Sequence, residues 1–293
     1  FARQHVTVSL SGDGGDELFG GYNRYLLAPN LRRAIRYLPR ASRKLLARAV
    51  AGVSPRHWDA LFNTLGKALP LRHRLPMAGD LLHKGAAMLS TEDVSQLYLN
   101  LISQWKSPAG VVIGSHEPDT TVQQLAQWAA TLDWQHGMMA LDTAWYLPSD
   151  VLVQLDRASM AVSLESRVPF LDPNVFEFAW RLPLNYKLHD GQGKWPLRQV
   201  LYKYVPRELI DRPKMGFGMP IDVWLRGPLR EWAESLLSET RLNREGFFNS
   251  SEIRLKWAQH LNHTHNWHYE LWNVLMFQQW HEAHAQLPVA QVA

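Results

Sequence analysis

The first residues of the chain alternate between apolar and polar side chains. Between residues 5 and 11, the side chains of Val6, Val8 and Leu10 fall on one face, and this period of two predicts a β-strand. A glycine-rich acidic turn, Ser-Gly-Asp-Gly-Gly-Asp-Glu, follows at residues 11–17 and leads into a short predicted helix. A strand, a glycine turn and a helix open nucleotide-binding α/β units, in which ligands bind beyond the carboxyl end of the strand.

Helical patterns fill most of the remaining chain, and capping residues mark some helix starts. Asp172 followed by Pro173 is an N-cap with proline at the first helical position. Ser90–Asp93 resembles a capping box for a helix that continues through Ile102. The other predicted helices cover residues 31–50 with a break at Pro39, 120–134, 135–146, 175–182, 194–204, 228–237, 250–262 and 266–285, and the segments near 103–119 and 205–227 are predicted loops. Because strand signals almost disappear after the first strand, we expect its sheet partners to precede Phe1.

The composition is that of a folded protein. The chain has 293 residues, of which 46% are hydrophobic and 20% charged, enough for one large domain or two smaller ones. No apolar run reaches the roughly 18 residues of a membrane span. Without cysteine, the chain contains no disulfide, thiolate metal site or cysteine nucleophile. Since it begins at Phe1 with no signal-peptide pattern, we expect a piece of a longer, cytoplasmic protein.

The acidic turn has two interpretations. Glycines allow backbone N–H groups to approach a phosphate closely, whereas a carboxylate repels a phosphate unless a cation lies between them. Asp13, Asp16 and Glu17 therefore favour a Mg²⁺–nucleotide site. The alternative is a solvated turn whose acids stabilise the helix N-terminus.

Two further segments carry candidate chemistry. Asp156, Arg157, Glu165 and Arg167 interrupt an otherwise apolar stretch, which indicates either an ion-pair network bracing two helices or carboxylates near a substrate. Lys214 lies in a loop rich in glycine and proline. A positioned ammonium there can stabilise charge on a phosphate or an oxyanion, and an exposed surface lysine is the alternative.

Taken together, these segments resemble the carboxyl-terminal, synthetase part of the glutamine-hydrolysing asparagine synthetases. The motifs that carry the resemblance are residues 11–22, 156–172, 193–198, and Arg-Pro-Lys at 212–214 with Phe217. The resemblance implies a predominantly α-helical chain that is the C-terminal part of an α/β pyrophosphatase-loop domain, adenine nucleotide α-hydrolase-like, with one or two strands retained. Residues 1–286 would form this part and residues 287–293 a flexible tail.

The resemblance also implies an activity, ATP-dependent amidation of aspartate to asparagine through an acyl-adenylate. The implied cofactors are ATP and Mg²⁺, and a glutaminase domain with an amino-terminal cysteine would supply ammonia from glutamine. Neither that cysteine nor a phosphate loop of the Ser-Gly-Gly-x-Asp-Ser type occurs in this sequence. We therefore expect the isolated chain to be inactive. The oligomeric state stays open, with a homodimer of the full-length protein as one alternative.

Matching the family's motifs residue by residue implies individual roles. Asp13 would act in forming the acyl-adenylate, Asp16 would bind Mg²⁺, and Lys214 would stabilise the oxyanion when ammonia attacks. The remaining implied site residues are Ser11, Gly12, Gly14 and Gly15 for ATP, and Tyr22, Asp156, Glu165 and Arg167 at or behind the substrate. Ser149 and Gln154 depart from the family pattern, which has Asp or Asn and Lys there. The loss of the lysine alters either substrate choice or a structural salt bridge.

Other functions remain as alternatives. A uronic-acid sugar of a surface polysaccharide is an alternative acceptor. Residues 18–58 contain nine Lys and Arg and no acid, as in a basic module that binds nucleic acid or a membrane surface. However, no nucleic-acid-binding motif is present, and we expect no nucleic-acid partner. The sequence His-Glu-Ala-His at residues 281–284 is one residue shorter than a zinc motif, which favours surface or interfacial histidines.

Overall fold

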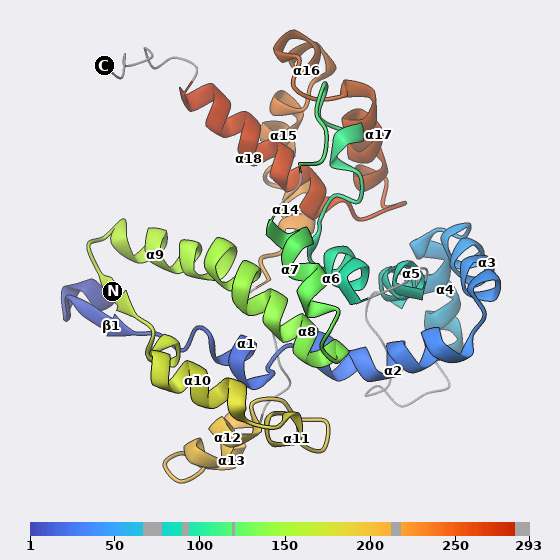
Figure 1. The fold of residues 1–293 in the computed structure, drawn as a ribbon. Coiled ribbons are helices and arrows are strands. Elements are labelled where there is room, and N and C mark those ends of the chain that lie inside the picture. Colours follow the sequence, from blue (N-terminus) through green and yellow to red (C-terminus); the bar gives the residue numbers. More distant parts are fainter. Residues whose placement is uncertain (67–77, 90–93, 119–120, 212–217, 285–293) are drawn as a thin grey trace. The chain divides into compact units, whose positions relative to one another are not determined.

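The computed structural model describes residues 1–66, 78–89, 94–118, 121–211 and 218–284 (Figure 1). The chain divides into two compact units. The first comprises Phe1–Arg43, Met88–Leu101 and Asp119–Lys214, and the second comprises Lys44–Ala87, Ile102–Pro118 and Met215–Ala293. The expected helical character is confirmed, and in the described part of the chain the strands belong to one small sheet.

The sheet lies in the first unit and has two parallel strands. The predicted strand is β1 (Val8–Leu10), and it pairs with β2 (Glu165–Arg167) with Ser9 opposite Ser166. The expectation that the strand has no partner within this chain is therefore wrong. The sequence of β2, Glu-Ser-Arg, has no alternation of apolar residues, so only its pairing with β1 identifies it as a strand.

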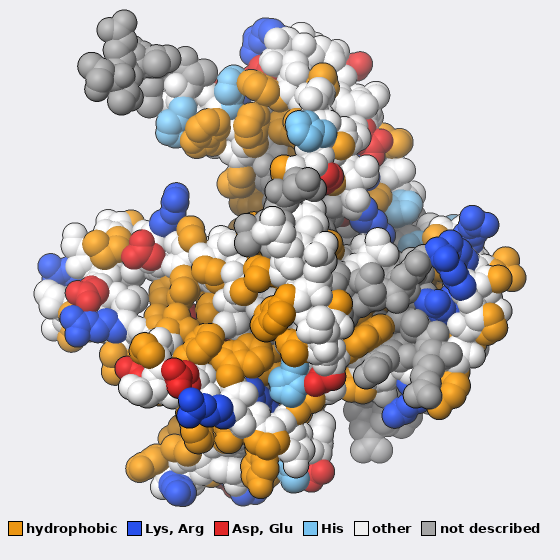
Figure 2. Space-filling model, viewed as in Figure 1, with side chains coloured by type: hydrophobic (Ala, Val, Ile, Leu, Met, Phe, Trp, Pro, Cys, Tyr) orange, Lys and Arg blue, Asp and Glu red, His pale blue; other side chains and the backbone are white. Residues whose placement is uncertain are grey.

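The described residues do not bury the apolar face of the predicted strand. The side chains of Val6, Val8 and Leu10 are 45%, 37% and 75% exposed. Figure 2 shows hydrophobic side chains on the surface between α9 (Leu152–Met160) and α10 (Pro173–Arg181), two helices of the same unit.

The helices of the first unit pack around α1. Leu18, Phe19 and Ala179 are buried together, joining α1 to α10. Asp172 caps α10 as predicted, because its carboxylate accepts from the Asn174 amide. Besides α9 and α10, the unit contains α1 (Gly15–Phe19), α2 (Asn23–Tyr37), α6 (Val94–Ile102), α7 (Thr121–Ala129), α8 (Trp134–Leu141), the π-helix η4 (Asp142–Val151), α11 (Leu184–Lys187), α12 (Trp195–Leu201), α13 (Arg207–Ile210) and the 3-10 turns Ala2–Gln4 and Pro169–Leu171.

The second unit is helical and has its own core. Trp257 is buried there with Leu225, Leu236 and Leu275. Its helices are α3 (Arg40–Ala51), which starts at the end of the first unit, α4 (Pro55–Gly66), α5 (Ala78–Leu89), α14 (Ile221–Arg226), α15 (Arg230–Leu236), α16 (Glu239–Glu245), α17 (Ser250–Leu261) and α18 (His268–His284), with a 3-10 turn at Pro108–Gly110. The predicted break at Pro39 is confirmed. The predicted loop over 205–227 is partly wrong, since α13 and α14 are too short to show helical periodicity.

Candidate functional site

The acidic turn leaves β1 and packs on the segment before α10. Gly14 caps α1 with a φ of +81°, and a Cβ added there would lie 2.9 Å from the Leu171 side chain. A Cβ added at Gly15 would lie 3.1 Å from the Phe170 ring. The positive φ makes glycine necessary at Gly14, whereas a side chain at Gly15 would require the Phe170 ring to shift by a few tenths of an ångström.

Two carboxylates of the turn have polar partners. The hydroxyl of Ser11 donates to the Asp13 carboxylate. The Nζ atom of Lys194 lies 2.9 Å from Oδ1 of Asp16, and these two side chains are about one-third exposed. A Cβ added at Gly12 would meet nothing within 4 Å, so the turn is open beside these carboxylates.

The donor chemistry of Asp16 suits Mg²⁺. This ion prefers oxygen ligands and is usually held by one or two carboxylates, together with water and the phosphates of a substrate. In the described part of the chain, no group of three or more His, Asp or Glu side chains is placed to hold a metal ion. Asp16 therefore fits a site at which most ligands are not supplied by the described residues.

Behind the turn, α1 carries a second acid that faces inward. Glu17 is 1% exposed, and the Tyr22 hydroxyl donates to its Oε1 at 2.6 Å. Burial raises the pKa of Glu17, and the hydrogen bond from Tyr22 opposes this rise. Tyr22, expected at or behind the substrate, thus uses its hydroxyl to satisfy a buried carboxyl group.

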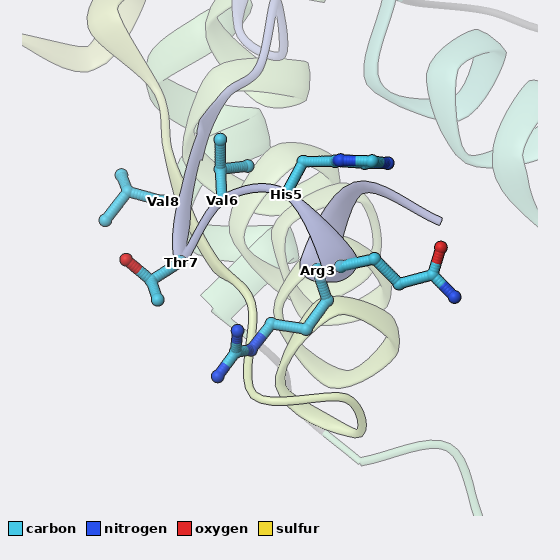
Figure 3. A pocket seen from close by; sticks show the side chains of 6 residues that line it. Arg3, His5, Val6, Thr7 and Val8 are labelled. Atoms are coloured by element: carbon cyan, nitrogen blue, oxygen red, sulfur yellow. The ribbon is translucent and has the colours of Figure 1, made fainter.

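Two hollows border β1. One, with a volume of about 410 Å³, is lined by residues 3–8, and Figure 3 shows Arg3, His5 and Val8 pointing in different directions around it. The other, of about 460 Å³, is lined by residues of the amino-terminal turn, β1, α9 and β2, and its polar side chains are those of Arg3, Ser9, Ser11, Ser159 and Ser166. Of the two hollows, the second reaches the acidic turn, at Ser11.

Comparison with known proteins identifies the family. The asparagine synthase family model matches residues 1–282. The chain belongs to the asparagine synthase family. A relative from Bacillus subtilis, asparagine synthetase [glutamine-hydrolyzing] 1, is 30% identical over 284 residues, covering 96% of this chain and 41% of its own length. A provisionally named glutamine-hydrolysing asparagine synthetase of Mycobacterium tuberculosis is 35% identical over 285 residues, covering 96% of this chain and 40% of its own length.

The chain thus spans about 40% of the length of these asparagine synthetase relatives. The amidase chyE of Penicillium rubens is more distant, at 24% identity over 83% of this chain and 37% of its own length. No solved structure matches the chain. Within the described residues, no helix has both the length and the apolar character needed to cross a membrane.

The other residues expected from the asparagine synthase motifs lie at several places. Lys214 lies outside the described residues. Asp156 is exposed on α9, and Glu165 and Arg167 are exposed on β2, where their side chains pair at 2.7 Å. Because both partners belong to one strand, this pair does not brace two helices, as one of the two interpretations required. Exposed pairs of this kind contribute about 0–1 kcal/mol to stability.

The structure gives Gln154 a local role. Its side-chain amide donates to the Asp150 carboxylate one helical turn earlier. A lysine at 154, as in the family pattern, would be placed to form an i, i+4 ion pair with Asp150. Gln154 therefore replaces an ion pair with a neutral donor. Nothing in the structure explains Ser149.

The histidines of α18 pack on aromatic rings. His281 stacks on Phe277, and His284 stacks on Trp280 while its Nδ1 lies 2.8 Å from the Trp280 carbonyl oxygen. This agrees with the interpretation of surface or interfacial histidines. It does not support a zinc motif, since the described residues provide no third ligand.

Three residues important to the geometry were not singled out from the sequence. Lys194 was part of a matching motif but had no assigned role, and it is the ion-pair partner of Asp16. Arg24 and Asp142 form a buried ion pair in the first unit. An isolated acid directly after the apolar run Met138–Leu141 was the available signal for Asp142.

Proposed function

We propose that the full-length protein is an ATP-dependent ligase that converts a carboxylate into an amide, with aspartate as the acceptor. The acceptor carboxylate attacks the α-phosphorus of ATP and releases pyrophosphate. Ammonia then attacks the acyl carbon of the adenylate, and AMP leaves. In this proposal residues 1–286 are the C-terminal part of the synthetase domain, and a glutaminase domain provides the ammonia.

The observation that carries the proposal is the geometry of the acidic turn in a chain of this family. The glycines bring the backbone close to the segment before α10, the turn is open at Gly12, and Asp16 presents an oxygen ligand next to the Lys194 ammonium. When bound there, Mg²⁺ would neutralise phosphate charge. Asp16 would hold the ion, and Lys194 would keep the Asp16 carboxylate oriented. Asp13, accepting from Ser11, would lie beside the nucleotide.

Lys214 is proposed for the second step. A lysine ammonium close to the acyl carbon stabilises the negative charge that develops on oxygen as ammonia attacks. The chain has no second glycine-rich phosphate loop of the Ser-Gly-Gly-x-Asp-Ser type. We therefore also propose that this chain alone does not complete the reaction.

The test measures pyrophosphate release by the full-length protein with ATP, Mg²⁺, ammonia and aspartate. We expect Asp16→Asn and Lys214→Ala to reduce the rate by about 100-fold or more, as for other removals of a group that stabilises a transition state. Glu177→Gln, on the exposed i, i+4 pair with Arg181, is the matched control and should retain the wild-type rate. Wild-type rates in both site variants would refute the assignment.

The acceptor is tested separately, because it depends on other residues. Aspartate and a free uronic acid are compared at equal concentration in the same assay. A higher kcat/KM for aspartate supports asparagine formation. Turnover of the uronic acid alone would keep the ligase chemistry and replace the acceptor.

A further inference from the structure

The carboxylate of Asp142 lies at the junction of α8 and η4 and is completely buried. It accepts two hydrogen bonds from the Arg24 guanidinium, at 2.8 and 2.7 Å. The hydroxyls of Tyr25 and Tyr98 donate to it at 2.5 and 3.0 Å. Burial raises the pKa of Asp142, and the Arg24 charge and these hydrogen bonds oppose the rise. The four donors thus give a buried anion full hydrogen-bonding and a counter-charge.

The same arginine leads from Asp142 toward the acidic turn. Its guanidinium carbon lies 4.1 Å from the centroid of the Tyr22 ring, a distance typical of a cation–π contact. Because Nε and Nη2 of Arg24 both donate to the Asp142 carboxylate, the plane of the guanidinium is fixed. The Tyr22 ring therefore rests on a rigid surface.

Tyr22 in turn touches α1. Its hydroxyl donates to Glu17, which is 1% exposed and directly follows Asp16 in α1. The helix α1 also contacts α8 and η4 within the same unit. A buried, hydrogen-bonded Glu17 restricts rotation of this short helix, and Asp16 projects from it toward Lys194.

We propose that Asp142 is a positioning residue for the acidic turn, acting through Arg24 and Tyr22 on Glu17 and so on the orientation of α1 and Asp16. Its effect on nucleotide binding rests on the proposed function, whereas its effect on α1 does not. Asp142 and Arg24 are separated by 118 residues, so this chain of contacts forms only when Arg24 of α2 and Asp142 of η4 come together. In this proposal Asp142 fixes the orientation of α1 and does not itself contact the reacting atoms.

Two variants separate positioning from simple stabilisation. Tyr22→Phe keeps the ring on Arg24 but removes the hydroxyl that holds Glu17. Tyr25→Phe removes a hydrogen bond to Asp142 without touching Glu17. We expect Tyr22→Phe to accelerate amide hydrogen exchange of α1 about tenfold, to weaken MgATP binding about tenfold and to lower the melting temperature, because the buried Glu17 carboxyl group loses its donor. Tyr25→Phe should lower the melting temperature and leave α1 exchange at the wild-type level.

The experiment uses the full-length protein, hydrogen exchange with mass spectrometry, and calorimetric titration with MgATP. Asp142→Asn should combine both effects, and Tyr186→Phe, an exposed tyrosine, should show neither. Wild-type exchange in α1 of Tyr22→Phe would overturn the proposal, even if Asp142→Asn does not fold. A wild-type protein that binds no MgATP would refute the proposed function, while the exchange measurement would still decide the positioning role.

Discussion

The side chains of Lys194 and Asp16 meet in the space that a side chain at Gly21 would occupy. A Cβ added to Gly21 would lie 1.8 Å from Oδ1 of Asp16 and 2.3 Å from Cε of Lys194. Gly193 is equally constrained, since a Cβ there would lie 2.1 Å from the Gly20 carbonyl oxygen. The two glycines allow α12 to approach the bend after α1 closely enough for the ion pair to form.

Gly21→Ala should therefore destabilise the first unit and break the ion pair. Forcing a methyl group into such a packed position costs about 1–3 kcal/mol of unfolding free energy. The measurement is urea-induced unfolding followed by circular dichroism. Gly85→Ala, where a Cβ would meet nothing within 4 Å, is the control and should be neutral or stabilising, because alanine favours the helix α5. Equal stability of wild type and Gly21→Ala would contradict the observed contact.

Lys187 is a buried charge that has no counter-ion among the residues that the structure describes. It is completely buried, its Nζ has no hydrogen-bond partner among the described residues, and it lies 5.0 Å from the Trp180 ring centroid. Burial lowers the pKa of Lys187 to about 8. At pH 7 both folded and unfolded states carry the proton, so the full cost of the buried charge is present.

Lys187→Met should accordingly stabilise the protein at pH 7 by about 1–3 kcal/mol. As the pH rises from 8 toward the ordinary lysine value, the folded state loses the proton first, and wild type should gain stability relative to the variant. Urea unfolding at pH 7 and pH 10 tests both statements, with the exposed Lys203→Met as control. A destabilised Lys187→Met at pH 7 would show that the ammonium has a partner of its own.

His260 predicts a pH dependence of the same sign in the second unit, but in a more acidic range. Its Nδ1 lies 3.3 Å from the Trp267 amide nitrogen and 3.3 Å from an Arg226 guanidinium nitrogen, so Nδ1 accepts and the ring is neutral. Burial lowers the pKa of His260 to about 4. Since the unfolded state takes up the proton first, stability should fall by up to about 3 kcal/mol between pH 6.5 and 4.

Replacement of His260 isolates this contribution. His260→Gln should flatten the stability profile between pH 6.5 and 4, measured by urea unfolding at half-unit steps. His116→Gln, at an exposed position, should keep the wild-type slope. A wild-type slope in His260→Gln would assign the acid sensitivity to other groups.

The buried pair of Arg24 and Asp142 is suited to a double-mutant cycle. Asp142→Ala leaves the guanidinium and two tyrosine hydroxyls without an acceptor, and the loss of one partner of a buried pair costs about 3–5 kcal/mol. Arg24→Met leaves the carboxylate without its counter-charge. The double variant should cost clearly less than the two single losses together, because no unpaired charge remains. Additive losses in thermal unfolding would mean that the two side chains do not interact.

Local features of the fold could be predicted from the sequence. The cap at Asp172, the break at Pro39 and the strand before the acidic turn were all predicted, and each depends on residues within a few positions. The strand β2 could not be predicted. Its ladder partner is 157 residues away, and its own residues carry no strand pattern.

The burial of the charged residues also could not be predicted from the sequence. Asp142 and Asp156 both interrupt apolar segments, but only Asp156 was singled out, because the family resemblance implied a place for it at or behind the substrate. In the structure Asp156 is exposed, whereas Asp142 is buried under Arg24 and two tyrosines. The sequence has an acid at both positions with similar neighbours. Whether each carboxylate is buried depends on which other helices pack against it in the fold.

By itself the sequence determined the asparagine synthase motifs, the glycine turn with its carboxylates and the local helix starts. These rest on short-range backbone conformations and hydrogen bonds that a few adjacent residues specify. Only the tertiary structure decided the partner of β1, the pairing of Asp16 with Lys194 and the network around Asp142. Those contacts form when distant segments bury surface together, and the free energy of burying a charge depends on the donors that the other segments bring.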